Sequence, residues 1–111
     1  MVRITDEFAH LGVVRGNLSM FRVNEALFLV NKCRERNIRI LGIDAFIVNP
    51  NTIQPVMEDS PDWSDVEPIE KTWELAETFF KKHHNSDLYF EIVPDQDWAP
   101  IAECPKPDQK L

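Results

Sequence analysis

Residues 38–48, IRILGIDAFIV, are rich in β-branched side chains and apolar at nearly every position. A run that is mostly apolar on both faces is typical of a central strand. The turn-forming residues 49–52, NPNT, follow it, so residues 53–57 are predicted to return as the second arm of a hairpin. In residues 88–93 every second position is Leu, Phe or Ile, which predicts a third strand with one buried face.

Two amphipathic segments predict the helices that cover this sheet. Residues 24–37 carry apolar side chains at three- and four-residue steps, with Asn24 as the expected N-cap. Pro68 is expected at the first position of a second helix that extends to about His84 and closes at Asn85. The pattern predicts an α+β fold, a small, mainly antiparallel sheet of about three strands with two main helices packed on one face.

Length and composition indicate a single domain. The chain of 111 residues is 43% hydrophobic and 28% charged, and it is long enough to bury a core without disulfides or metals. We expect one domain over residues 1–111. Residues 1–23 form its N-terminal segment, in which Thr5 is expected to cap a pair of helical turns that Gly12 closes, and residues 95–111 form a Pro-rich tail.

The compartment is predicted from what the sequence does not contain. No apolar run reaches the ~18 residues of a membrane span, and the N-terminal stretch has no basic start followed by an apolar segment. These features favour a cytoplasmic protein. In a reducing compartment Cys33 and Cys104, which lack CxxC spacing, are expected to be a core thiol and a tail thiol rather than a disulfide.

Negative charge is concentrated in one segment. Residues 58–77 hold eight acids against one base, Lys71, so this window has a net charge of −7, the same as the whole chain. Residues 1–56 are mildly basic, and the second half is therefore the negative pole of a dipole. Such a pole repels nucleic acid and membrane surfaces and attracts basic proteins.

The helix periodicity aligns four of these acids. At 100° per residue Glu67, Glu70, Glu74 and Glu77 fall on one stripe of the second helix, opposite an aromatic face. A solvated helix face is the simplest interpretation, because acids near a helix N-terminus interact favourably with its dipole. The alternative is a docking surface for a basic partner, since like charges spaced four residues apart repel and only Lys71 is at hand to relieve them.

Trp63 lies inside the acidic loop, in PDWSD. Its indole is either folded back as a lid on the core or held out as an interface anchor, because tryptophan is enriched at binding hot spots. The predicted partner-binding residues combine this tryptophan with the acids around it and along the helix. They are Asp59, Asp62, Trp63, Asp65, Glu67, Glu70, Glu74 and Glu77.

Other candidates for chemistry have simpler explanations. Asp44 lies in mid-strand and is expected to accept hydrogen bonds as a structural carboxylate, the alternative being a catalytic carboxylate. The acidic loop lacks the alternation and glycine of an EF-hand, and His83 and His84 suit a helix C-terminus without a metal. We expect no catalytic residues, no metal and no cofactor. An enzyme stays a minority hypothesis.

A family resemblance adds to this interpretation over about residues 24–94. The strand IRILGIDAFIV with Gly42 and Asp44, the returning segment TIQPVMED, the PDW tryptophan and an aromatic helix leading into LYFEIV resemble small immunity proteins. These belong to bacterial polymorphic-toxin and contact-dependent inhibition systems. Such families often show Gly-Gly-Asp after the first strand, where this chain has Gly42, Ile43 and Asp44.

The resemblance implies a non-enzymatic protein that binds one cognate toxin domain and occludes it. A basic toxin, such as a nuclease, suits an acidic inhibitor, because nucleases need positive charge to hold phosphates. The predicted partner is therefore a toxin protein, with no nucleic acid and no membrane. The alternatives are a generic acidic protein-interaction module and a small hydrolase or metal-dependent enzyme.

Overall fold

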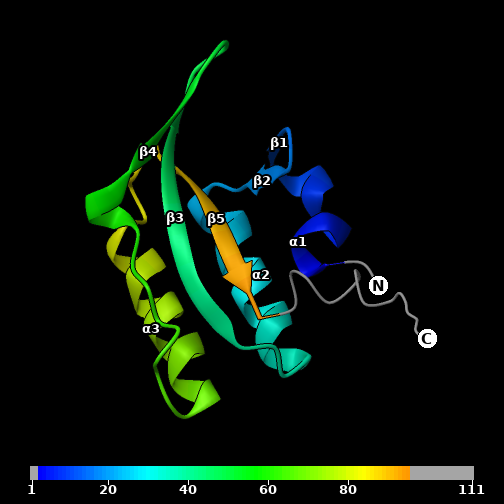
Figure 1. Cartoon of the computed structure of the whole chain (residues 1–111), viewed down its shortest axis with the longest axis vertical. Coiled ribbons are helices and arrows are strands. Elements are labelled where there is room, and N and C mark those ends of the chain that lie inside the picture. The colour runs from blue at the N-terminus through cyan, green and yellow to red at the C-terminus, as the bar shows by residue number, and fades with distance from the viewer. Residues whose placement is uncertain (1–2, 96–111) are drawn as a thin grey trace, which may run out of the picture.

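A computed structural model describes residues 3–95 (Figure 1). Its helices are α1 (Ile4–Glu7), the 3-10 turn η1 (Ala9–Leu11), α2 (Val23–Glu35), the 3-10 turn η2 (Met57–Asp59) and α3 (Ile69–Lys82). Its strands are β1 (Val13–Arg15), β2 (Leu18–Met20), β3 (Ile40–Val48), β4 (Ile53–Val56) and β5 (Tyr89–Pro94).

The main sheet has three antiparallel strands in the order β4-β3-β5, so the predicted central strand is confirmed. β3 and β4 form the predicted hairpin, and β3 pairs with β5 over most of its length. The register puts Ile43 opposite Ile92 on one face and Asp44 opposite Glu91 on the other. One strand thus supplies both the floor of the core and a polar row on the opposite face.

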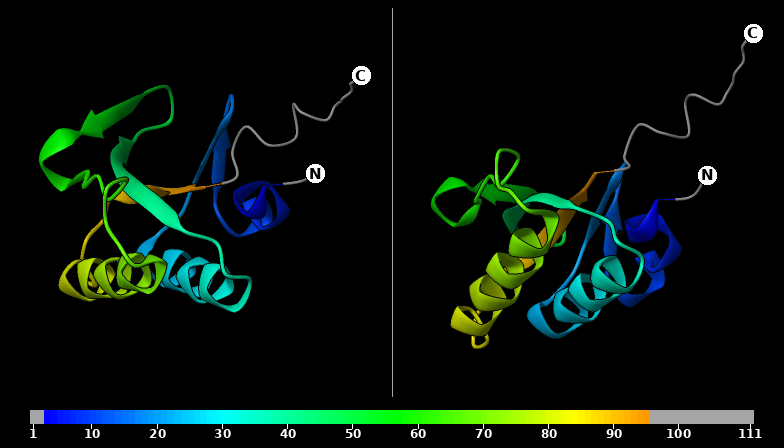
Figure 2. Two further views of the ribbon diagram at one scale, coloured as in Figure 1. Left: turned by 60° about the horizontal axis from the view of Figure 1, so that its bottom comes forward. Right: turned by 90° about the horizontal axis from the view of Figure 1, so that it is seen from below.

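The two long helices lie side by side on one face of this sheet (Figure 2). Leu29 of α2 and Phe80 of α3 meet Phe90 and Ile43 of the sheet in one core, and all four side chains are almost fully buried. The Nε1–H of Trp73 donates to the Ile38 carbonyl at 2.7 Å, which ties α3 to the entry of β3. The predicted α+β architecture is confirmed.

The ends of the two main helices differ from the prediction by one or two residues. α2 begins at Val23 with Arg22 as its N-cap, and Asn24 caps nothing because it is already inside the first turn. Its C-terminus is closed by Asn37, whose φ of 58° permits the Ile38 amide to donate to the Cys33 carbonyl at 2.8 Å.

The second helix is shorter than predicted at both ends. Pro68 is the N-cap of α3 rather than its first residue, and the helix ends at Lys82 with His83 as the C-cap, before the predicted Asn85. In the N-terminal segment Thr5 does not cap α1; Arg3 is the N-cap and Thr5 is buried in the first turn. Gly12 does close the second turn, as expected.

A hairpin of β1 and β2 was not predicted. Its turn is Gly16-Asn17, in which Gly16 has a φ of 59°, as the first central residue of a tight hairpin turn requires. Phe21 exchanges two backbone hydrogen bonds of 2.8 Å with Phe90, so the hairpin continues the main sheet beyond β5. The signal in the sequence that identifies it is the glycine followed by asparagine between the short segments VVR and LSM.

Burial accounts for Cys33, whose thiol lies in the core and whose pKa is raised to about 12 by desolvation. The thiol therefore stays protonated and unreactive at neutral pH. Cys104 and nearly all of the predicted tail, residues 96–111, lie outside the described residues. Across residues 3–95, the helices fall short of the length and apolar character that crossing a membrane demands.

Candidate functional site

The acidic loop is held against the free edge of β3. β4 pairs with β3 only as far as Ala45, and beyond that point residues 60–63 take its place. The Ile43 amide donates to the Pro61 carbonyl at 3.1 Å, and the Trp63 amide donates to the Leu41 carbonyl at 2.7 Å. Backbone hydrogen bonds therefore hold the loop along the edge of β3, in the place that a longer β4 would occupy.

Ser60 and Gly42 make this docking possible. The Ser60 hydroxyl accepts from the Ala45 amide at 3.0 Å and donates to the Val56 carbonyl at 2.9 Å, bridging the gap where β4 leaves β3. A Cβ on Gly42 would lie 2.7 Å from the Pro61 carbonyl oxygen, so only glycine permits this close approach.

Trp63 packs against the core as a partly buried side chain. Its ring meets Phe79 of α3 edge to face, with centroids 6.4 Å apart at 82°. The loop residues around it are polar, but tertiary packing supplies the apolar neighbours that the local sequence lacks. This geometry is that of a lid on the core, the first of the two alternatives for this residue.

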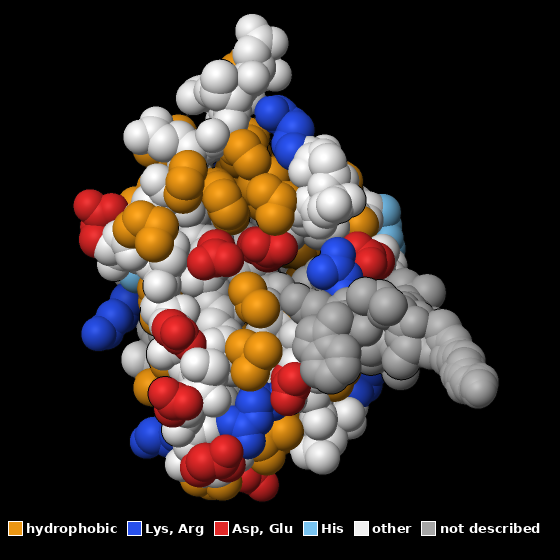
Figure 3. Space-filling view, viewed as in Figure 1, with side chains coloured by type: hydrophobic (Ala, Val, Ile, Leu, Met, Phe, Trp, Pro, Cys, Tyr) orange, Lys and Arg blue, Asp and Glu red, His pale blue; other side chains and the backbone are white. Residues whose placement is uncertain are grey.

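The predicted acidic residues divide into paired and unpaired groups. The paired ones are Glu67 with Arg39 (3.0 Å to both carboxylate oxygens), Glu77 with Arg34 (3.7 Å) and Lys81 (3.6 Å), and Asp59 with His83 (3.3 Å). Within the acidic segment 58–77, the exposed acids without an ionic partner are Glu58, Asp62, Asp65, Glu70 and Glu74. Figure 3 shows acidic side chains along the side of the molecule that the loop and α3 form.

The expectation that Lys71 alone relieves the stripe is wrong. Arg39 neutralises Glu67 at the N-terminal end of the stripe. Arg34 of α2 neutralises Glu77 at its C-terminal end. The carboxylate of each pair is solvent-exposed, so each pair contributes little stability. What they change is the surface, because the uncompensated charge is confined to the loop and to the first half of α3.

His83 has a structural explanation in its contacts. Its ring stacks on Phe79 with centroids 4.3 Å apart, and its Nδ1 lies 2.8 Å from the Phe79 carbonyl oxygen. Through Asp59 it also joins the C-terminus of α3 to the start of the acidic loop. Nowhere in the described part of the chain do three or more His, Cys, Asp or Glu side chains gather as metal ligands would.

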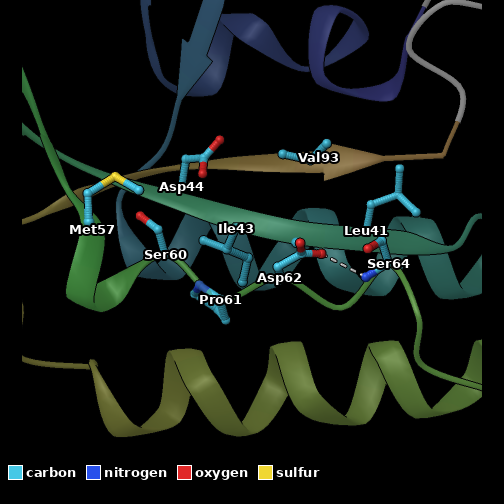
Figure 4. A pocket seen from close by; sticks show the side chains of 10 residues that line it. Leu41, Ile43, Asp44, Met57, Ser60, Pro61, Asp62, Ser64 and Val93 are labelled. Atoms are coloured by element: carbon cyan, nitrogen blue, oxygen red, sulfur yellow. Dashed lines mark hydrogen bonds between the residues drawn. The ribbon is translucent and has the colours of Figure 1, made fainter.

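A recess of about 390 Å³ opens between β3 and the acidic loop (Figure 4). Asp44 and Asp62 line it together with the hydroxyl-bearing Ser60 and Ser64 and an apolar rim that includes Met57. The Ser64 amide donates to Asp62 at 2.9 Å and holds the pKa of that carboxyl below its usual value. Figure 4 shows the Asp44 and Asp62 carboxylates pointing in different directions, so they do not form a clamp for one small ion.

Asp44 differs from the structural carboxylate that we predicted. It is half-buried, yet none of the described residues donates a hydrogen bond to its side chain. Burial raises the pKa of Asp44 above its ordinary value, and the negative charge of Asp62 raises it further. A half-buried charge that receives no hydrogen bond is a cost to the fold at neutral pH.

We therefore expect Asp44→Asn to stabilise the fold by on the order of 0.2–1 kcal/mol at neutral pH. An acid whose pKa is raised in the folded state destabilises it at pH values above that raised pKa. The penalty is lost as the pH falls through the folded value toward 3.8, the ordinary pKa of this group. Urea unfolding of both proteins between pH 3 and pH 7 tests this; a variant less stable at pH 7 would contradict it.

Sequence reasoning singled out Asp44 and Asp62 separately but did not bring them together. It also missed Ser60, Ser64 and Met57, which complete the recess. No local pattern identifies them, because the recess exists only where residues 60–63 lie along β3.

Comparison with known proteins adds no relative. No family model matches the chain, and no curated protein matches it. The resemblance to immunity proteins stays a prediction from the sequence. The geometry and charge of the surface therefore carry the functional argument.

Proposed function

We propose that this chain is an immunity-type protein that binds a basic toxin domain and blocks it by occlusion. The observation that carries the proposal is the exposed acidic surface of the loop and α3. Glu58, Asp65, Glu70 and Glu74 have no ionic partner among the described residues, and a basic protein would provide one.

The rigidity of the elements beneath this surface also supports binding. Backbone hydrogen bonds hold the loop to β3, and Trp63 anchors it on Phe79. A charged surface held in one geometry loses little conformational entropy when a partner docks. Long-range attraction would speed association, and the preorganised loop would set the register.

Capture of a partner tests the proposal directly. The purified chain should retain one basic protein from the source organism, and that protein should arrest growth when it is expressed alone in a bacterial host. Co-expression of this chain should restore growth at a one-to-one ratio. A captured protein that is harmless would instead favour a generic acidic interaction module.

Reversing charge on the unpaired acids should slow association. Glu70→Lys combined with Glu74→Lys is expected to reduce the association rate at least tenfold at low salt, and less as salt is added, because these charges act before contact. Glu77 is left unchanged, since it also joins α2 to α3 through Arg34.

The matched control for this prediction places the same charge change on α2. Glu25→Lys with Glu35→Lys alters net charge equally but away from the acidic surface, and it should slow association far less. Equal effects of the two double variants would mean that net charge alone, and not this surface, attracts the partner.

A small hydrolase is a second candidate that one observation favours. Asp44 combines a raised pKa with a position in a recess that also holds the ionised Asp62, a pattern seen in pairs of catalytic carboxylates. Asp44→Asn would then abolish turnover of a chromogenic ester, phosphate or glycoside substrate while the fold stays intact. Wild-type protein without turnover on these substrates argues for the binding function.

A further inference from the structure

The face of the sheet opposite α2 and α3 carries a second feature. No described helix covers it, as the two views in Figure 2 show. The pairing of β3 with β5 arranges it in rows: Gly42 with Val93, Asp44 with Glu91, and Phe46 with Tyr89. An acidic row therefore lies between two rows that bear apolar side chains.

Figure 3 views this face directly and shows two acidic side chains with hydrophobic groups above and below them. Pro55 of β4 pairs with Phe46 and extends the upper apolar row. Met57, at the rim of the recess, is 75% exposed, far more than the other large hydrophobic residues in the described part of the chain. Exposed apolar groups around a charged centre are typical of a binding surface.

The recess between β3 and the loop opens beside this acidic row. Asp44 and Asp62 approach it from the strand and from the loop respectively, with Met57 and Val93 among the residues around them. The Asp44 carboxylate accepts no hydrogen bond from residues 3–95 and sits near two other carboxylates. A cation placed here would gain charge-assisted hydrogen bonds and remove a repulsion already present.

The shape and lining select among cations. Two carboxylates that point in different directions do not suit a single metal ion, whereas a guanidinium presents donors along several edges. Its flat faces are weakly hydrated and pack against apolar groups such as Met57 and Val93. A lysine ammonium is a single compact, strongly hydrated charge, and it lacks the flat, weakly hydrated faces that suit the apolar rim.

We propose that the recess bounded by Asp44, Asp62 and Met57 receives an arginine side chain of the protein partner, with the sheet face around it as the docking surface. This inference rests on the proposed function, because it names where on this chain the basic partner inserts its anchor. The acidic surface on α3 then guides the approach, and the recess supplies the buried contact.

The first arm of the test uses the partner. Asp44→Asn combined with Asp62→Asn should weaken its Kd about thirtyfold or more, because an arginine would lose both charged acceptors. Asn at position 62 still accepts from the Ser64 amide, so the loop keeps its shape. Glu25→Gln with Glu35→Gln removes the same charge on α2 and should change the Kd less than threefold.

The second arm uses a small probe on the full chain. N-acetyl-arginine amide should shift the NMR amide signals of Gly42, Ile43, Ser64 and Val93, and the neutral N-acetyl-citrulline amide should not. Equal shifts with both compounds, or no shift at these amides, would overturn the inference. Shifts that follow protein concentration without any probe would assign the face to a second copy of the chain and overturn it as well.

The two arms separate the inference from the proposed function. A toxic partner that binds the double Asn variant as tightly as the wild type would leave the function standing and remove the recess as its anchor. A specific arginine response in a protein that captures no toxin would confirm the arginine site and reject the function.

Discussion

Replacing Trp63 with alanine is expected to lower the free energy of unfolding by about 3 kcal/mol. The indole fills space against Phe79 at the edge of the core, and alanine would leave that space empty or flooded. The same substitution should change partner affinity only as far as the loop loosens, because the packed ring offers little surface for contact. Chemical denaturation and binding measured on one preparation test both statements.

Trp63→Phe is the matched control. A phenyl ring keeps an edge-to-face contact with Phe79 and should recover more than half of the lost stability. An interface anchor behaves in the opposite way, with affinity falling by about 2 kcal/mol or more and stability hardly changed. That outcome would return Trp63 to the predicted partner-binding residues as a direct contact.

Gly42→Ala is expected to cost about 3 kcal/mol and to detach the acidic loop from β3. The new methyl would meet the Pro61 carbonyl oxygen, which belongs to the backbone and cannot rotate away. Separation of the loop would break the hydrogen bonds from Ile43 and Trp63. Hydrogen exchange at these two amides should therefore accelerate along with the fall in global stability.

Gly16→Ala is the control that distinguishes a steric clash from the cost of an unfavourable backbone conformation. Nothing lies within 4 Å of a Cβ at Gly16, and its cost comes from the φ of 59° alone. We expect about 1 kcal/mol there and no change in exchange at Ile43 or Trp63. If both alanine variants lose the same stability and leave those amides protected, the close approach at Gly42 is not what positions the loop.

The loop connects these two results to the recess. Trp63 attaches the loop to the core, and Gly42 lets the loop lie against the edge of β3. Loss of either should widen the gap between Asp44 and Asp62. A weakened response to N-acetyl-arginine amide in Gly42→Ala is therefore expected even though neither carboxylate is changed.

Local patterns predicted the main elements because the relevant physics is local. The run 38–48 is mostly apolar and rich in β-branched residues, which predicted a central strand, and NPNT predicted the turn that follows it. The 3.6-residue period likewise predicted which side of α3 is buried. Helix ends were less accurate, because the predicted caps Asn24 and Asn85 compete with neighbouring residues that begin or close the turn almost as well.

The sequence predicted several of the residues that belong to the candidate site but not how they are arranged. Sequence reasoning identified the acidic loop, Trp63 and Asp44, but not the ionic partners that divide the acids into two groups. Arg39 and Arg34 are distant in sequence from Glu67 and Glu77, and only the packing of α3 beside α2 and β3 brings them into reach. The repulsion that we inferred between the glutamates is therefore partly relieved by arginines outside α3, which the sequence of the helix does not identify.

The sequence by itself determined the α+β class, the central strand and a negative pole in the second half of the chain, since periodicity and charge depend on covalent order. Only the tertiary structure decided which carboxylates remain unpaired, that Trp63 is a lid, and that Asp44 and Asp62 line one recess. These features depend on distances between residues far apart in the chain. Such distances arise when loop 60–63 docks on β3. This docking requires that residue 42 has no Cβ and that Trp63 is buried against the core, and no local pattern encodes either contact.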